Sequence, residues 1–101
     1  MSVKVSHRSE DAYDELCTIV DEGARIVDVY VEHSCYGKIV IPLNISNRSE
    51  ARTFSEQLVE SGEKTLGELT RGVHYHTIEA DTQVALIRVQ KALNEKGYLS
   101  K

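Results

Sequence analysis

The chain has 101 residues, of which 41% are hydrophobic and 28% are charged, with six glycines and one proline. This composition is typical of a globular domain with one hydrophobic core, and we expect a single domain over residues 1–101 rather than a disordered or fibrous protein. The net charge of −4 disfavours nucleic-acid binding by the domain on its own, because attraction to phosphates supplies much of that affinity.

The sequence favours a cytoplasmic location. No stretch has the length and hydrophobicity of a membrane span, and the first residues lack the basic and apolar pattern of a secretion signal. The two cysteines are not spaced as a metal-binding Cys-x-x-Cys pair, and cytoplasmic thiols are normally reduced. We expect Cys17 to lie in the core, and Cys35 to lie in a turn, where it is either incidental or near a pocket.

The first third of the sequence predicts a strand, a helix and another strand. Residues 3–7 alternate between apolar and polar side chains, which is typical of a half-buried strand. Ser9 is a suitable N-cap for the following helix, and Gly23 is a suitable end. The apolar side of that helix consists of Ala12, Leu16, Ile19 and Val20. In the strand over residues 25–33, the side chains expected on one face are Val27, Val29, Val31 and His33.

A hairpin is expected next. Residues 34–37 form a candidate turn, followed by an antiparallel strand over residues 39–45. Pro42 has no N–H group to donate, so we expect this strand to lie at the edge of the sheet or to be bulged at that position. The side chains expected to face inward are Ile39, Ile41, Leu43 and Ile45.

The second half predicts two more helices and two more strands. Ser46 or Asn47 can cap a second helix closed by Gly62, and Asp81 can cap a third helix closed by Gly97. Between them lie a weak strand over residues 66–70 and a stronger strand over residues 73–80. The helical residues expected in the core are Ala51, Phe54, Leu58, Val59, Ala85, Leu86, Val89, Ala92 and Leu93. The order βαββαββα predicts an α+β fold with a mainly antiparallel sheet and three helices on one face.

Residues 72–78, Gly-Val-His-Tyr-His-Thr-Ile, place two histidines two positions apart on an expected strand. Side chains with this spacing point to the same face, so His74 and His76 can approach one ion without bending the backbone. Imidazole suits zinc, nickel, cobalt, iron and copper. Two solvated surface histidines would produce the same pattern, and this segment alone does not choose between the interpretations.

The other two histidines lie at strand ends, where a structural role is the simpler interpretation. His33 ends the second strand and His7 the first. Glu15 lies in the helix that directly follows His7, so these two side chains could meet at the junction of strand and helix.

Two longer motifs resemble the three-histidine (3H) domain. The first is Ile-Val-Asp-Val-Tyr-Val-Glu-His over residues 26–33 followed by Tyr36-Gly37, and the second is Gly-Val-His-Tyr-His-Thr-Ile-Glu-Ala over residues 72–80. That domain is the C-terminal, small-molecule-sensing half of nicotinate-responsive repressors of NAD biosynthesis and niacin salvage in bacteria. The resemblance covers essentially the whole chain and implies an HPr-like, two-layer βαββαββα sandwich.

The resemblance also implies a metal site. The family uses a histidine at the end of the first strand, a glutamate eight positions later and both histidines of the His-x-His strand, which match His7, Glu15, His74 and His76. This ligand set suits a divalent transition metal such as zinc, nickel, cobalt or iron, without choosing among them. A six-coordinate ion would leave two positions for water or ligand, whereas a tetrahedral ion would be closed.

A nicotinate pocket needs an aromatic or apolar wall and a donor for the carboxylate. The candidate ligand-binding residues are His33, Tyr36 and Tyr75 for the wall and hydrogen bonds, and Arg71 or Lys38 for the carboxylate. Tyr75 lies between two metal-ligand candidates on a strand and therefore points to the opposite face, which makes a core role the simpler interpretation. Arg71 stands where we expect a glycine in the family's turn.

Family members act as dimers, so the resemblance implies a homodimer. They also carry an N-terminal winged helix-turn-helix, which does not fit in the six residues before His7. We therefore expect an excised sensor domain, rather than a stand-alone relative, that binds nicotinate or a related pyridine and reaches DNA only through a helix-turn-helix domain absent from this chain. We expect no enzyme, although a small metal-dependent enzyme is the alternative. A phosphocarrier role rests on fold analogy alone.

Overall fold

The computed structural model describes residues 1–61 and 70–100. Its elements are β1 (Ser2–Ser6), the 3-10 helix η1 (Ser9–Asp11), α1 (Ala12–Val20), β2 (Arg25–His33), β3 (Gly37–Ile45), α2 (Arg48–Ser61), β4 (Val73–Glu79) and α3 (Gln83–Glu95). The weak strand expected over residues 66–70 lies outside the described residues, apart from Thr70, and so does the expected stop at Gly62. Among the described residues, no helix is long and apolar enough to cross a membrane.

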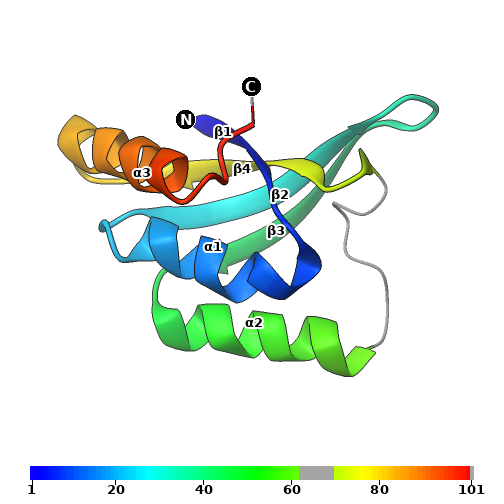
Figure 1. Ribbon diagram of the computed structural model, residues 1–101, viewed down its shortest axis with the longest axis horizontal. Coiled ribbons are helices and arrows are strands. Elements are labelled where there is room, and N and C mark those ends of the chain that lie inside the picture. The colour runs from blue at the N-terminus through cyan, green and yellow to red at the C-terminus, as the bar shows by residue number, and fades with distance from the viewer. Residues whose placement is uncertain (62–69, 101) are drawn as a thin grey trace.

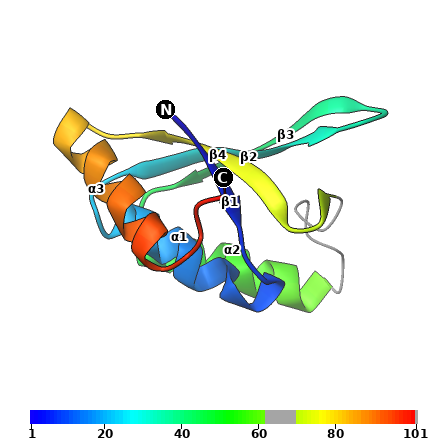
Figure 2. The same ribbon diagram turned by 45° about the horizontal axis from the view of Figure 1, so that its top comes forward.

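The four described strands form one antiparallel sheet in the order β1-β4-β2-β3. Helices α1, α2 and α3 lie on the same face of this sheet, with α1 between the other two (Figures 1 and 2). This arrangement confirms the expected α+β fold with a helical layer on one face. Because β4 is a central strand, its helix-facing side chains lie under the helical layer and are withdrawn from solvent.

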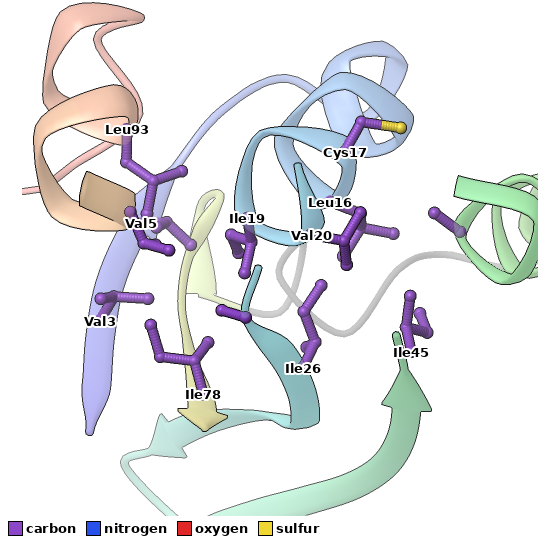
Figure 3. Packing of buried hydrophobic residues seen from close by; sticks show 13 residues of the cluster. Val3, Val5, Leu16, Cys17, Ile19, Val20, Ile26, Ile45, Ile78 and Leu93 are labelled. Carbon is purple, nitrogen blue, oxygen red and sulfur yellow. The ribbon is translucent and has the colours of Figure 1, made fainter. Parts of the chain in front are cut away.

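The hydrophobic core fills the space between the sheet and α1, α2 and α3. Figure 3 shows side chains from β1, β4 and α1 meeting there, with Leu93 of α3 closing one side. Residues without measurable exposure include Val5, Ile19, Ile26, Val31, Ile78, Val89 and Leu93. Burying one such side chain contributes about 1.5–3 kcal/mol to stability. Cys17 is buried in this core as expected, and Cys35 is exposed.

Side-chain caps fix the starts of two helices. The Oδ1 of Asn47 accepts a hydrogen bond from the N–H of Glu50 at 2.8 Å, which confirms Asn47 as the cap of α2. The expected cap of α3 is wrong by one position. Thr82, not Asp81, accepts the hydrogen bond from the N–H of Ala85, at 3.1 Å. A threonine hydroxyl and an aspartate carboxylate serve equally as caps, so local sequence does not separate neighbouring candidates.

Two residues expected in the core are exposed, and the burial pattern of β2 differs from the expected one. Val27 is half-buried because a β-bulge after Ile26 shifts the alternation of β2, and Ile26 takes the core position instead. Ile41 is 43% exposed on edge strand β3. Val59 is 82% exposed because it lies one residue, or about 100° around the helix, beyond the half-buried Leu58. The edge position of β3 confirms the expectation based on Pro42.

Candidate metal centre

Four ionisable side chains meet between the sheet and α1. Glu15 of α1 is completely buried, His74 and His76 of β4 are buried, and His7 follows the end of β1. His7, Glu15 and His74 can bring one ligand atom each within 4.8 Å of one another, a group that could hold a metal ion. The structure thus brings together all four side chains that the family resemblance implied as metal ligands.

The secondary structure explains why these residues face one another. His74, His76 and Ile78 alternate along the helix-facing side of β4, and all three are buried. Glu15 and Ile19 are four residues apart and therefore share one side of α1. Ile19 packs against the sheet through apolar contacts, and Glu15, one helical turn earlier, contacts the histidines of β4. Ser9 does not cap α1 as expected, because it lies in η1, which carries the chain from His7 into the helix.

Strand pairing supports the two histidines of β4. Val3 lies opposite His76 and Val5 lies opposite His74 in the antiparallel pair of β1 and β4. Side chains of directly opposed residues project to the same face and contact each other. Both valines are buried, so they exclude water from the flanks of the imidazole rings. The apolar surroundings strengthen every electrostatic interaction inside the cluster.

One carboxylate oxygen is the centre of the cluster. Oε1 of Glu15 lies 2.9 Å from Nε2 of His76 and 3.3 Å from Nε2 of both His7 and His74. With bonds of about 2.1 Å to a common ion, neighbouring ligand atoms are about 3.0 Å apart in octahedral and about 3.4 Å apart in tetrahedral geometry. The two separations of 3.3 Å fall in that range, and the separation of 2.9 Å lies just below it. Each Nε2 is therefore spaced from Oε1 about as two ligands of one ion are.

The opposite nitrogen of each ring is held by a main-chain carbonyl. Nδ1 of His7 donates to the carbonyl of Arg8 at 2.6 Å, and Nδ1 of His74 donates to the carbonyl of Gly72 at 2.9 Å. Nδ1 of His76 donates to the carbonyl of Asp28 at 3.0 Å. Because a carbonyl only accepts, each Nδ1 carries a hydrogen, and the Nε2 of a neutral ring presents its lone pair to the cluster. Three lone pairs facing a carboxylate repel one another unless protons or a metal ion lie between them. The donor set therefore fits a metal ion.

The charges inside the cluster stabilise one another. Burial by itself raises the pKa of Glu15, but attraction to His76 and hydrogen bonds from the three histidines hold that pKa well below its usual value of 4.5. Burial lowers the pKa of His7 and His76, yet their interactions with Glu15 outweigh burial and raise both above 6.5. Without metal, the cluster thus favours the carboxylate form of Glu15 and the protonated forms of His7 and His76.

The second carboxylate oxygen of Glu15 lacks a polar contact of this kind within the described part of the chain. Oε2 is buried and has no hydrogen-bond partner among the described residues. Leaving a buried charged acceptor unsatisfied costs about 1–3 kcal/mol or more. A cation bound at the carboxylate would remove this cost, which is a second indication that the site fits a metal ion.

Comparison with known proteins agrees with this geometry. The family model of the 3H domain matches residues 1–101. The chain belongs to the 3H domain family. It is 38% identical over 97 residues to a probable transcription repressor NiaR of Thermotoga maritima, covering 96% of this chain and 55% of that protein. It is 35% identical over 95 residues to the transcription repressor NadR of Bacillus subtilis, covering 94% of this chain and 53% of that protein.

The 3H domain spans about half the length of both relatives that it matches. Both relatives are named as transcription repressors, a class of proteins that regulate rather than catalyse. Both alignments cover nearly all of this chain. The part of each relative that lies beyond the alignment has no counterpart in the residues described here.

The residues expected to bind nicotinate lie in three different parts of this 3H domain. His33 and Tyr36 belong to the β2–β3 hairpin, which extends beyond the helices (Figures 1 and 2). The Nδ1 of His33 accepts hydrogen bonds from the N–H groups of Cys35 and Tyr36. The rings of His33 and Tyr36 stack with centroids 4.9 Å apart. This is the structural role considered for His33 from the sequence alone.

Tyr75 lies on the face of the sheet opposite the candidate metal centre, as its position between His74 and His76 predicts. Its ring stacks on that of Tyr30 with centroids 4.8 Å apart and an angle of 3° between the planes. Lys38, the alternative partner for the carboxylate, places its Nζ 4.2 Å from the centroid of the Tyr30 ring. These three side chains form a cluster of their own on that face.

Arg71 is the candidate partner for the nicotinate carboxylate that lies nearer in sequence to the candidate metal centre. It is exposed in the turn before β4 and has a φ of 59°, in the left-handed region that favours glycine. This conformation explains why a glycine was expected there. The next residue, Gly72, has a φ of 90° and supplies the carbonyl that holds His74. The turn therefore affects the orientation of a cluster histidine.

Sequence reasoning missed the residues that support the cluster histidines. The carbonyl of Asp28 holds His76, and its side-chain Oδ1 accepts a hydrogen bond from the N–H of Thr77 at 3.1 Å. Asp28 reads as an ordinary polar residue of an alternating strand, and its position at the β-bulge has no signature in the sequence. A main-chain carbonyl can be supplied by any residue, so no residue type indicates it.

Proposed function

We propose that this 3H domain is the regulatory, effector-binding domain of a transcription repressor, and that it binds one divalent transition-metal ion through His7, Glu15, His74 and His76. The observation that carries the proposal is the convergence of three Nε2 atoms on one buried carboxylate oxygen. The names of both relatives support the regulatory role. We place the protein in the cytoplasm, where such repressors meet DNA.

The chemistry of the donor set limits the choice of metal. Three imidazole nitrogens and one carboxylate oxygen suit zinc, nickel, cobalt or iron better than magnesium or calcium, which prefer oxygen ligands. Such an ion, when bound, offers any open coordination position to the nitrogen or carboxylate of a small molecule. The protein orients the rings through the carbonyls of Arg8, Gly72 and Asp28.

We further propose that the effector is nicotinate or a related pyridine and that it binds beside the metal. The proposal rests on the resemblance to nicotinate-responsive repressors of NAD biosynthesis and niacin salvage. Arg71, in the turn that leads to His74, is the candidate cation for the carboxylate. His33, Tyr36 and Tyr75 remain candidates for the wall only if the effector also reaches the hairpin or the opposite sheet face.

Regulation requires the effector to favour one state of the repressor. The domain would act as a homodimer and reach DNA through a helix-turn-helix domain of the longer protein. A ligand shifts such an equilibrium only as far as its affinity differs between the two states. Effector binding at the cluster would thus have to change the arrangement of the two subunits or of their DNA-binding domains.

The test is a calorimetric titration of nicotinate into metal-loaded and chelator-stripped protein, with bound metal quantified in parallel. We expect binding to the loaded form alone. Equal binding to both forms would make the metal structural and move the effector site elsewhere, and no binding to either form would refute the nicotinate assignment.

A pair of histidine variants tests the metal site itself. His74→Ala should abolish bound metal, whereas His33→Ala, which removes a histidine outside the cluster, should leave the metal content unchanged. Equal metal content in His74→Ala and the unmodified protein would refute the site. Loss of a measurable chemical turnover in His74→Ala would instead favour a metal-dependent enzyme.

A further inference from the structure

Residues 98–100 lie alongside β1, on the edge that does not pair with β4 (Figures 1 and 2). The N–H of Ser6 donates to the carbonyl of Tyr98 at 2.8 Å, and the N–H of Ser100 donates to the carbonyl of Lys4 at 2.9 Å. An isolated antiparallel bridge pairs Val5 with Leu99. These contacts hold the end of β1, where the chain is about to present His7.

The side chain of Tyr98 joins the two segments that carry His7 and Glu15. Its ring packs edge-on against the ring of His7, with centroids 5.7 Å apart. Its hydroxyl donates to Oδ2 of Asp14 at 2.7 Å, and Asp14 immediately precedes Glu15 in α1. Lys96 reinforces this anchor, because its Nζ lies 3.1 Å from both carboxylate oxygens of Asp14.

The charge states of Asp14 and Tyr98 near neutral pH suit the hydrogen bond between them. The hydrogen bond from Tyr98, together with Lys96, lowers the pKa of Asp14, so that Asp14 is a carboxylate and can accept. Burial and the bond to Asp14 raise the pKa of Tyr98, so its hydroxyl keeps its proton and donates. The contact therefore does not depend on a charge change near neutral pH.

His7 depends on such support more than the other two histidines do. His74 and His76 lie within β4, a central strand paired on both sides, whereas His7 follows the last residue of β1. The carbonyl that holds its Nδ1 belongs to its own neighbour, Arg8, so this bond does not tie the ring to another part of the fold. The ring is placed by its contacts with Glu15, His74 and Tyr98.

We propose that Tyr98 is a positioning residue of the metal centre, which holds the His7 ring against Glu15 by tying residues 98–100 to Asp14 of α1. The inference rests on the proposed metal site. In this arrangement His7 is the first ligand to dissociate when the ion leaves. The contact between Tyr98 and Asp14 controls how often His7 dissociates from the ion. Loosening this contact speeds release of the ion without removing any ligand.

The test compares Tyr98→Phe with Tyr13→Phe in cobalt-loaded protein. Tyr98→Phe keeps the ring and removes the hydroxyl. Tyr13→Phe is a matched control, because it removes a hydroxyl of α1 that is hydrogen-bonded to Arg52 at 3.3 Å and lies outside the cluster. Release of Co²⁺ to excess chelator is followed by its visible absorption. We expect Tyr98→Phe to release the ion about tenfold faster, as outer-shell changes do, and Tyr13→Phe to release it at the original rate.

A second variant separates positioning from a general loss of stability. Asp14→Asn weakens the acceptor that Tyr98 and Lys96 share. The effects of Asp14→Asn and Tyr98→Phe on cobalt release should therefore be less than additive, because both changes weaken the contact between Tyr98 and Asp14. Additive effects of the two changes, or equal release rates in Tyr98→Phe and the unmodified protein, would overturn the inference.

Ring resonances of the metal-free protein provide a readout that does not need the ion. Tyr98→Phe should shift the NMR signal of the His7 ring and leave that of His76 in place, whereas Tyr13→Phe should move neither. If the unmodified protein takes up no cobalt, the proposed metal binding fails, and the ring signals still decide whether Tyr98 positions His7. An unchanged His7 signal in Tyr98→Phe would overturn the inference on its own.

Discussion

Nε2 of His76 lies 2.9 Å from Oε1 of Glu15, so a side chain of the central strand β4 meets one from α1 across 61 positions of sequence. Both side chains are buried, and the contact joins the sheet to the helical layer. An ion bound at this point would contact both layers at once. Metal binding and folding are therefore expected to be coupled.

Glu15→Gln tests this coupling. The amide keeps the shape of the side chain but removes the charge that balances the imidazoles, so metal affinity should fall by more than the roughly 10- to 100-fold caused by losing an outer-shell partner. Metal content after dialysis and the thermal shift on adding metal are the measurements. Glu10→Gln, which removes an exposed carboxylate, should behave as the unmodified protein. A full thermal shift in Glu15→Gln would contradict the prediction.

The stability of the metal-free protein should depend on pH in a defined window. His7 and His76 have raised pKa values, so their contribution is complete below pH 6.5 and is lost as the pH rises through their folded pKa values. Glu15 has a lowered pKa, so its contribution is complete above pH 4.5 and is lost as the pH falls through its folded pKa. The cluster therefore stabilises the metal-free fold most between these two values.

Denaturant midpoints measured from acidic to mildly alkaline pH check this window. Metal affinity should show the opposite trend on the alkaline side and increase with pH, because the imidazoles must lose their protons to bind the ion. In Glu15→Gln the fall in metal-free stability above pH 6.5 should become smaller, since the partner that raises both histidine pKa values has lost its charge. An identical pH profile in this variant would exclude the cluster as the source.

Gly72→Ala should weaken metal binding as well as the fold. Gly72 and Gly23 have φ angles of 90° and 88°, so alanine at either position should cost about 1–2 kcal/mol of stability. A Cβ at Gly72 would also meet the carbonyl of His7 at 3.4 Å, and the carbonyl of Gly72 holds His74. Gly23→Ala is the matched control, because a Cβ there meets nothing within 4 Å and Gly23 lies in the turn between α1 and β2, away from the residues that hold the cluster histidines.

Chemical denaturation and a chelator competition measure the two effects separately. We expect both alanine variants to lose stability and Gly72→Ala alone to lose metal affinity. Equal metal affinities in the two variants would show that the turn before β4 does not orient His74.

Arg71→Ala should weaken nicotinate binding and leave metal binding unchanged. Losing one charge-assisted hydrogen bond to a carboxylate reduces affinity by about tenfold. Lys38→Ala, which removes a cation that packs on Tyr30 at the opposite sheet face, is the control and should retain the original affinity. Calorimetry with metal-loaded protein makes the comparison. The reverse result would place the effector on the face that carries Tyr30 and Tyr75.

Local patterns in the sequence were sufficient for most of the fold. Strand alternation and helical spacing depend on neighbours within a few residues, so the described α-helices and strands were predicted in order, whereas the 3-10 helix η1 was not. The same alternation predicted that His74 and His76 share a face. The identities of the four cluster residues came from motifs that resemble the 3H domain, and the structure brings their side chains together.

Local patterns failed where a choice depended on the rest of the molecule. A bulge in β2 decided that Ile26 rather than Val27 is buried, and it arises from pairing with two neighbouring strands. Thr82 rather than Asp81 caps α3, although both residue types are suitable. In each case the sequence offers two acceptable states of similar local energy, and tertiary packing selects one.

By itself, therefore, the sequence determined the elements, the family and the identity of the four side chains that meet at the candidate metal centre. Only the tertiary structure decided how those side chains are held, because their supports come from distant residues or from main-chain carbonyls that carry no residue signature. Asp28 orients His76 from another strand, and Tyr98 bonds to Asp14 across 84 positions while packing against His7. Strand order and register bring these groups together, and neither can be read from local spacing.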